Sequence, residues 1–511
     1  MPSKSISIFH TSDIHGHFLS QDYAQKTTSE SGASRLSQFL KATRHPGDIY
    51  MDTGDVLQGN ALAYYLAKHP STPHPFSTVF NALKLDYFTL GNHDFNFGLP
   101  VLSSFLDPLN AQIINANILR DGSPFYGVPH VIHTCENGVK LGIIGLTTHY
   151  IPNWENPAHI AGLEFHDAFS SLTREIQVIN DQCDFLIVNY HGGFEGDLET
   201  FDITSNTGEN QGIKMLQELP EIDLLLTGHQ HQTLHQKVGN TWVSQPGMNA
   251  ASVHVITLDF GEGIKAPTVR MQAIDLADYS EDPDILDLLS DVESHTQSFL
   301  DQPIGQFDQA YRIADGFKAR LNKHPLVTWI NQVQLNATGA DVALCGLGNA
   351  VTGFNQSVTL RDVLATYVYP NTLVVKAVTG DALLKALEKT ARFFALKDGE
   401  LGVSNAFETP KKEYYNYDMY DPITYTIDVR EPVGHRIKDA RLNGIPINPD
   451  TIYKVAMNNY RASGGGDYPM FKDATLLLDT QQEIVTLLIE AISNGPVVTL
   501  DDPKNITILG D

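Results

Sequence analysis

The stretch LGNHDFN, residues 90–96, follows an apolar run that starts at Tyr87 and is typical of a short buried strand. The strand pattern ends at Gly91, and an amide, an imidazole and a carboxylate come directly after it. Open α/β sheets bind their ligands at the carboxyl ends of strands. The stretch therefore predicts a ligand or metal site at a sheet edge.

Four other apolar runs end in the same way, with Asp, Asn or His next to a glycine. They lead into the stretches SDIHG (12–16), DTGD (52–55), NYHGG (189–193) and GHQH (228–231). In two of these stretches the candidate ligands are two residues apart, as Asp13 and His15 are. In extended chain that spacing puts both side chains on one face. Five strand ends of one design predict a single shared centre.

The five stretches offer more ligands than one metal ion can use. The candidates are Asp13, His15, Asp55, Asn92, His191, His229 and His231. Imidazole and carboxylate together suit zinc, manganese or iron. So many ligands favour two divalent ions about 3.5–4 Å apart, which would activate a hydroxide for attack on a phosphoryl group. Because each carboxylate oxygen can bind a different ion, Asp55 is the predicted bridge.

The periodicity of the chain predicts two domains. From residue 5 to about 260, apolar runs alternate with helical patterns, which indicates an α/β domain with helices covering the sheets. The acidic, apolar-periodic segment 278–303 predicts one connecting helix. Beyond it helices and strands are mixed. We expect a metal domain at 1–277, a linker helix at 278–303 and a smaller nucleotide-binding domain at 304–511.

Composition narrows the possible partners. Acidic residues outnumber basic ones 60 to 34, and the formal net charge is −26, which disfavours nucleic acid polymers and anionic membranes. A small anionic substrate fits if bound metal ions reverse the sign locally. With no apolar run of membrane-spanning length, no basic and apolar leader and few cysteines, we expect a cytoplasmic protein that does not enter a membrane. The oligomeric state is not indicated.

In this order and spacing, the motifs DIHG, GD, GNHD, HGG and GHQH resemble the signature of the calcineurin-like metallophosphoesterases. With its second half, the whole chain resembles the 5′-nucleotidase/2′,3′-cyclic-nucleotide phosphodiesterase family. The resemblance implies a four-layer α/β/β/α metal domain, joined by a helix to a smaller mixed α/β domain. It also implies a metal-dependent phosphohydrolase that acts on nucleotides.

The resemblance divides the ligands between two ions that share Asp55. His93 would stabilise the phosphoryl group or donate a proton there. One ion would take Asp55, Asp13, His15 and His231, and the other would take Asp55, Asn92, His191 and His229.

The second half contains candidate residues for holding the nucleotide. The run NNYRASGGGDYP (458–469) resembles the family's substrate loop. In this loop Tyr460 offers a ring on which a base can stack, and Asp467 would receive ribose hydroxyls. Tyr415, in the run YYNYD (414–418), resembles the other wall of the base clamp.

Two positions depart from the family pattern. Asn96 stands where 5′-nucleotidases often carry an aspartate, and an amide cannot raise the pKa of His93 by charge as a carboxylate would. Either His93 then acts as a neutral donor or Asp94 compensates. The loop NAVTGF (349–354) keeps Asn349 but lacks the arginine expected there. The missing arginine argues against the usual grip on a 5′-nucleotide phosphate. Asn96 and the runs NQVQLNATGADVAL (331–344) and NNYRA (458–462) favour the cyclic-phosphodiesterase branch.

Other functions fit the same motifs. A pyrophosphatase that cleaves nucleotide sugars or dinucleotides would use the same ions, and only the second domain distinguishes it. A nucleotide-binding regulator would keep the fold without turnover, although the complete ligand set argues against it. A nuclease is disfavoured by the acidic charge.

Overall fold

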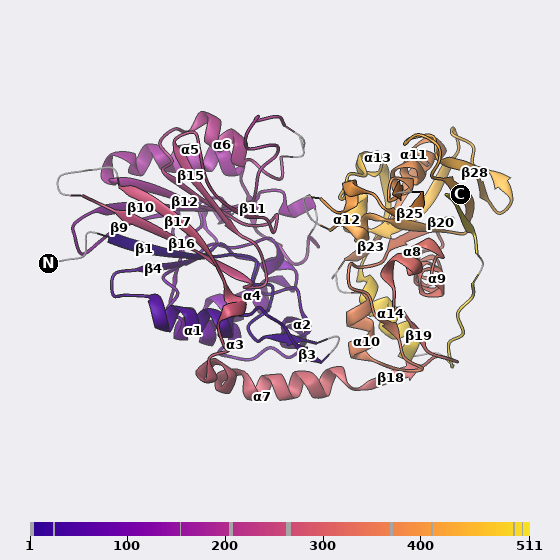
Figure 1. Ribbon diagram of the computed structural model, residues 1–511, viewed down its shortest axis with the longest axis horizontal. Coiled ribbons are helices and arrows are strands. Elements are labelled where there is room, and N and C mark those ends of the chain that lie inside the picture. Colours follow the sequence, from indigo (N-terminus) through magenta and orange to yellow (C-terminus); the bar gives the residue numbers. More distant parts are fainter. Residues whose placement is uncertain are drawn as a thin grey trace. The chain divides into compact units, whose positions relative to one another are not determined.

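The computed structural model describes residues 5–23, 26–153, 155–203, 208–261, 267–367, 371–397, 399–409, 412–493, 496–502 and 504–510. The chain forms two compact units, Met1–Gln297 and Ser298–Asp511 (Figure 1). The division falls within helix α7 (Pro283–Leu300), and the predicted domain limits lie on either side of this helix. Among the described residues, no helix combines the length and the apolar character that crossing a bilayer requires.

The first unit contains two six-stranded sheets. In the first sheet, β1, β4, β5 and β6 are parallel neighbours, while β16 and β17 are antiparallel additions beyond β1. Its strands, in spatial order, are β17 (Thr268–Asp275), β16 (Ser252–Asp259), β1 (Ser5–Thr11), β4 (Ile49–Asp52), β5 (Tyr87–Phe88) and β6 (Gln112–Ile113).

The second sheet has a parallel centre formed by β10, β12, β13 and β15. Antiparallel strands close both edges. In spatial order the strands are β14 (Thr233–Val238), β15 (Thr241–Pro246), β13 (Leu224–Thr227), β12 (Phe185–His191), β10 (Lys140–Thr147) and β9 (His130–Thr134).

The two sheets pack face to face, with helices on their outer faces (Figure 1). Buried apolar side chains of both sheets, such as Ile8 and Ile187, belong to one core cluster. Helices α5 (Ala168–Ile179) and α6 (Gly212–Glu218) cover the second sheet. Helices α1 (Ala33–Thr43), α3 (Pro75–Ala82) and α4 (Gly98–Leu106) cover the first through aromatic contacts. This arrangement confirms the predicted α/β/β/α fold.

The parallel strands bring their carboxyl ends to a common edge, and the five polar stretches follow there. One strand is shorter than the sequence predicts, because β5 ends at Phe88 rather than Leu90. The carbonyl of Leu90 instead accepts a hydrogen bond from Thr147 Oγ1 of the second sheet, at 2.6 Å. The chain therefore leaves the first sheet two residues early.

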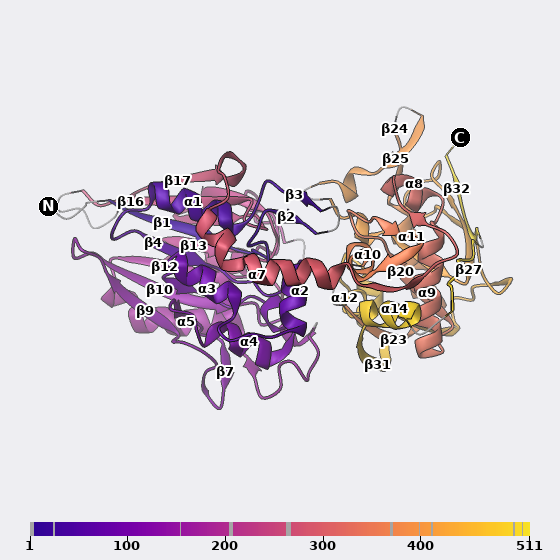
Figure 2. The ribbon, with the colours of Figure 1, turned by 90° about the horizontal axis from the view of Figure 1, so that it is seen from below.

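The second unit is mixed α/β. Its five-stranded sheet has the order β26 (Asp418–Asp421), β20 (Val342–Gly346), β30 (Ile452–Asn458), β23 (Thr372–Thr379) and β31 (Thr475–Glu483). A four-stranded sheet contains β29 (Ile445–Pro446), β28 (Ile437–Leu442), β27 (Ile423–Asp428) and β32 (Ile506–Leu509), and its last two strands run side by side in Figure 2. Helices α9 (Pro325–Thr338), α11 (Gly380–Ala391) and α14 (Ile484–Ser493) contribute to one apolar core.

Candidate metal centre

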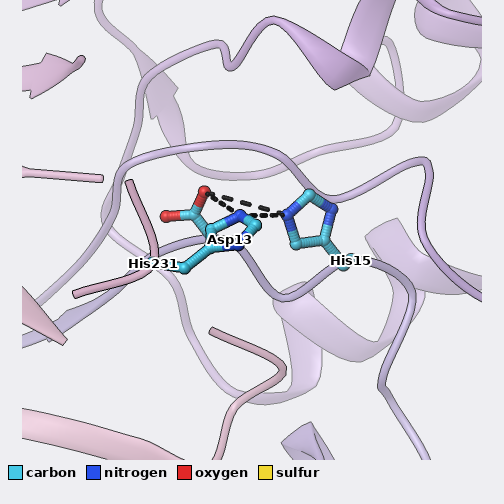
Figure 3. Close-up of side chains that lie close together, drawn as sticks. All are labelled: Asp13, His15 and His231. Atoms are coloured by element: carbon cyan, nitrogen blue, oxygen red, sulfur yellow. Dashed lines mark hydrogen bonds and ion pairs between the residues drawn. The ribbon is translucent and has the colours of Figure 1, made fainter. Parts of the chain in front are cut away.

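A first cluster of predicted ligands brings together the side chains of Asp13, His15 and His231, although His231 is 216 residues away from His15 along the chain (Figure 3). Oδ1 of Asp13 lies 3.4 Å from Nε2 of His231 and 3.8 Å from Nε2 of His15. The two imidazole nitrogens are 2.9 Å apart. One carboxylate and two imidazoles thus converge on one point, as the ligands of a divalent ion do.

A second cluster gathers Asp55, His191 and His229, with Asn92 beside them. Oδ2 of Asp55 lies 3.2 Å from Nε2 of His191. Oδ1 of Asn92 lies 3.1 Å from that same nitrogen and 2.8 Å from Nδ1 of His229. The structure therefore brings together the seven predicted ligands in two groups, which correspond to the division that the resemblance implies.

Backbone hydrogen bonds hold the two clusters side by side. The N–H of His15 donates to the carbonyl of Asp55 at 2.9 Å. The N–H of His229 donates to both carboxylate oxygens of Asp13, at 3.0 and 3.1 Å. Each cluster is thus hydrogen-bonded to a chain segment that contributes a residue to the other cluster.

Hydrogen bonds at the outer ring nitrogens of two histidines determine which ring nitrogen faces the cluster. Nδ1 of His15 lies 2.7 Å from the carbonyl oxygen of Gln58, and Nδ1 of His191 lies 2.6 Å from that of Thr53. A carbonyl only accepts, so both Nδ1 atoms carry the proton. In the neutral rings the Nε2 lone pairs then point inward, as metal ligation requires.

His229 has the opposite orientation. Its Nε2 lies 2.7 Å from Oε1 of Glu209, so this nitrogen carries the proton and Nδ1 faces inward. A carboxylate behind a ligating imidazole fixes the ring and raises its basicity. Sequence reasoning missed Glu209, because this residue follows Gly208 in the loop after β12 and no strand end marks its place.

A buried oxygen of Asp55 supports the fit of the site to a cation. Oδ2 of Asp55 is buried, and among the described residues no hydrogen bond of good geometry reaches it, although Nε2 of His191 lies 3.2 Å away. Leaving such an oxygen unsatisfied is costly, whereas a cation would satisfy it. Its other oxygen, Oδ1, accepts from the backbone N–H of His93 at 2.6 Å. Asp55 therefore keeps one oxygen available for a positive charge.

The protonation states of three ligands differ with their surroundings. Burial and the charge of His231 lower the pKa of His15 to about 3, so this ring is neutral and ready to ligate. Burial would raise the pKa of Asp13, but the facing His231 lowers it to about 2. Although burial opposes it, Asp55 raises the pKa of His191 to about 9, so a cation binding there must displace a proton.

The ligands adopt a backbone conformation that the sequence did not predict. Paired ligands two residues apart were expected in extended chain, and that expectation is wrong. The turns beyond the strands place them in the left-handed region, which non-glycine residues rarely occupy and which functional sites often retain. The φ values are 55° at Asp13, 51° at His15, 61° at Asp55, 69° at His229 and 57° at His231.

Gly91 makes room for the shared aspartate. A Cβ atom at this position would lie 2.8 Å from Cγ of Asp55 and would overlap its backbone nitrogen. The glycine that ends the strand pattern is thus required by the close approach of the loop after β4.

His93 and Asp94 leave the strand end in different directions. The ring of His93 lies beside the first cluster, with its centroid 5.4 Å from that of His15. Nδ1 of His93 lies 2.6 Å from Oδ1 of Asn96. The carboxylate of Asp94 instead accepts from the backbone N–H groups of Val56, Leu57 and Gly91, at 2.8 to 3.1 Å. These contacts assign Asp94 to holding the ligand loops.

The predicted nucleotide-binding residues lie in loops and short helices of the second unit. Tyr415 lies in the 3-10 turn Tyr414–Asn416, and Tyr460 lies in α12 (Asn459–Ala462). The ring of Tyr460 packs over Gly465, where a Cβ atom would lie 2.5 Å from its Cε2. The predicted base clamp stays a prediction.

Asn349 and Asp467 are engaged with residues of the same unit. Nδ2 of Asn349 donates to the carbonyl of Lys412 at 2.7 Å. The carboxylate of Asp467 pairs with Lys389 and lies 3.6 Å from Nη1 of Arg392. Its predicted contact with ribose hydroxyls stays a prediction.

Comparisons with known proteins agree with this architecture. Residues 6–233 match the calcineurin-like phosphoesterase family, and residues 303–473 match the 5′-nucleotidase C-terminal domain family. A solved structure of a candidate 5′-nucleotidase from Staphylococcus aureus is 34% identical, with a TM-score of 0.89, and the match covers 99% of this chain and 100% of that one.

Two curated relatives are more distant. The trifunctional nucleotide phosphoesterase protein YfkN of Bacillus subtilis is 25% identical over 97% of this chain, which spans 38% of that protein's length. The 2′,3′-cyclic-nucleotide 2′-phosphodiesterase/3′-nucleotidase of Haemophilus influenzae is 25% identical, over 90% of this chain and 80% of the relative. Both domain families match, and the Staphylococcus aureus structure is 34% identical over 99% of this chain. The chain is therefore a phosphoester hydrolase that belongs to the calcineurin-like metallophosphoesterases with a 5′-nucleotidase C-terminal domain.

Proposed function

We propose that this protein hydrolyses phosphate esters of nucleotides and that 2′,3′-cyclic and 3′-nucleotides are its preferred substrates. One observation carries the hydrolytic part of this proposal. In a buried site, Nε2 of His191 faces Oδ2 of Asp55 at 3.2 Å and Oδ1 of Asn92 at 3.1 Å, and although burial opposes it, Asp55 raises the pKa of His191, so the site favours a positive charge. A metal cation that binds there takes the place of the proton on Nε2.

The donor set is suited to a pair of zinc, manganese or iron ions, and we propose one of these as the cofactor. Such ions, when bound, supply Lewis acidity that activates water and offsets charge at a phosphoryl group. Asp13, His15 and His231 would hold one ion, and Asn92, His191 and His229 would hold the other with Asp55 shared. The left-handed backbone at five of these positions keeps the donors in place before the substrate arrives.

His93 is the residue of this chain best placed to act on the substrate. Its backbone N–H is bound to Asp55, and one ring nitrogen is bound to Asn96. The remaining ring nitrogen, Nε2, would contact the phosphoryl group or the departing oxygen. A positioned proton donor of this kind contributes about 10²- to 10⁴-fold to a reaction rate.

Two features support the choice of substrate class. The Haemophilus influenzae relative carries the name of a cyclic phosphodiesterase and 3′-nucleotidase. In this chain the loop 349–354 has no arginine, and Asn96 replaces the aspartate that 5′-nucleotidases often carry. The Staphylococcus aureus structure supports 5′-nucleotides as the second candidate class.

A panel assay tests the proposal. Purified protein with manganese is supplied with 2′,3′-cyclic AMP, 3′-AMP, 5′-AMP and UDP-glucose, and products are separated by chromatography. We expect the cyclic and 3′ substrates to be turned over at least tenfold faster than the others. Preference for UDP-glucose would establish a pyrophosphatase instead. If metal-loaded protein binds nucleotides but cleaves none of them, the protein is a binding regulator.

A further inference from the structure

The carboxylate of Glu155 lies directly behind Asn96, on the side away from His93. Nδ2 of Asn96 lies 2.6 Å from Oε2 of Glu155. The other carboxylate oxygen lies 2.8 Å from the backbone nitrogen of Asn156 and 2.8 Å from Nδ1 of His159. With these partners, the Glu155 side chain is only 7% exposed. It is held in one position and contacts the residue that departs from the family pattern.

This contact determines the orientation of the Asn96 amide. An ionised carboxylate only accepts hydrogen bonds, so the NH₂ group of Asn96 must face Glu155. The amide oxygen must then face His93, where it accepts the proton of Nδ1 at 2.6 Å. The choice between the two amide orientations thus follows from chemistry rather than from small differences in distance.

We propose that Glu155 is a positioning residue for hydrolysis, which acts on His93 through Asn96. It holds the amide in one orientation, and the amide oxygen keeps one ring proton of His93 on Nδ1. Nε2 is then the ring nitrogen presented to the substrate, and the proton for the departing oxygen is the second proton of the ring, carried on Nε2. The inference rests on the proposed role of His93 in hydrolysis.

The arrangement explains why an asparagine at position 96 fits this chain. An aspartate there would face the Glu155 carboxylate at about the same distance, and two carboxylates so close cannot both ionise without a penalty. With the amide as a spacer, the negative charge is placed one residue farther from His93. Linked hydrogen bonds polarise one another, so the carboxylate still strengthens the bond between the amide and the ring.

A pair of exchanged variants tests the inference. Glu155→Gln leaves two amides facing each other, so the orientation of Asn96 is no longer fixed. Asn96→Asp places two carboxylates against each other. In the double variant Glu155→Gln/Asn96→Asp, the carboxylate at position 96 accepts from His93 and from the amide at position 155, and the orientation is again unique. We expect each single variant to lower kcat about 10- to 100-fold, as outer hydrogen-bond partners do in metal sites.

The double variant is expected to recover to within about threefold of wild type, with KM changed little throughout. A residue that merely supported the fold would give losses that add up, without rescue. Glu175→Gln is the matched control. Oε2 of Glu175 also lies 2.8 Å from a histidine nitrogen, Nδ1 of His130, and the Glu175 side chain is 8% exposed. This control should keep wild-type kcat, and metal content and melting temperature are measured for every variant.

The leaving group provides a second readout. Hydrolysis of 3′-AMP releases a poor leaving group that requires a proton, whereas p-nitrophenyl phosphate releases a stable phenolate. The single variants should lose at least tenfold less activity on the aryl ester than on the nucleotide. Wild-type activity in Glu155→Gln, or additive losses in the double variant, would overturn the inference while the proposed function stands. Absence of nucleotide hydrolysis by the wild-type protein would overturn both.

Discussion

Oε1 of Glu209 lies 2.7 Å from Nε2 of His229, so an acidic side chain from a loop orients a histidine that we predict to be a metal ligand. We expect Glu209→Gln to keep the hydrogen bond but lose the charge, and to weaken metal binding about 10- to 100-fold. Titration of the metal-free protein with manganese, followed by calorimetry, measures this. Glu175→Gln, at the His130–Glu175 pair, should leave the affinity unchanged. Equal affinities in both variants would contradict the assignment of Glu209.

The proposed role of Asp55 as the ligand shared by two ions leads to a stronger prediction. Asp55→Asn should lower turnover by about 10²-fold or more, and metal analysis should find less than the full pair of ions. The fold should persist, because the apolar core between the two sheets does not include Asp55. Asp223→Asn is the control, since Asp223 bonds the backbone of Leu186 and is not a ligand. Full metal content and turnover in Asp55→Asn would refute the bridging role.

His93 should separate turnover from metal binding. The side chain contacts Asn96 and stands beside the first cluster without belonging to either group of ligands. His93→Asn is therefore expected to reduce kcat about 10²- to 10⁴-fold while both ions remain bound. On one preparation, elemental analysis measures the bound metal and steady-state kinetics measures kcat. If the substitution also empties the site, His93 is a ligand and the division of roles is wrong.

Gly91 offers a steric test of the centre. Gly91→Ala would push its methyl group against the backbone and carboxylate of Asp55. We expect loss of metal and of activity, with a helix and strand content close to wild type by circular dichroism. Gly348→Ala is the control, because a Cβ there meets no described atom within 4 Å. Unchanged metal content in Gly91→Ala would show that the loop after β4 can move away.

Burial of Asp52 makes the stability of the first unit depend on pH. Burial raises the pKa of Asp52 to about 8, so the folded protein keeps this proton where the unfolded chain has lost it. At this group the folded state binds more protons, so the contribution of Asp52 to the free energy of unfolding falls as pH rises from about 4 to about 8, by about 1.4 kcal/mol per pH unit. Asp94, whose pKa burial raises to about 6, contributes in the lower part of this range.

Between pH 6 and pH 8, Asp52→Asn should remove the contribution of Asp52 and leave that of His191, whose pKa is raised to about 9. Urea unfolding of the metal-free protein at several pH values measures it, with Asp450→Asn, at an exposed position, as the control for net charge. Parallel stability curves for wild type and Asp52→Asn would contradict the prediction.

The sequence pattern identifies the sheets and the residues that gather in the candidate metal centre, because both depend on local features. A buried strand that ends at a glycine beside Asp, Asn or His is visible within a few residues, as at Gly91. The supporting carboxylates are not visible in this way. Glu155 and Glu209 lie in loops without a distinctive pattern, and their partners are 59 and 20 residues away.

Backbone conformation and ion pairing are the other features that the pattern does not predict. The left-handed φ of Asp13 arises where a loop must turn sharply between two sheets. The pairing of Asp467 with Lys389 joins residues 78 positions apart. Features of this kind depend on tertiary packing, which a periodicity of two or 3.6 residues does not encode.

The pairing of His15 with His231 spans 216 positions of the chain. During synthesis, the first cluster therefore cannot exist until almost the whole first unit has left the ribosome. Metal acquisition should consequently occur late and together with sheet assembly, and a truncated chain that ends before His229 should be unable to retain either ion firmly.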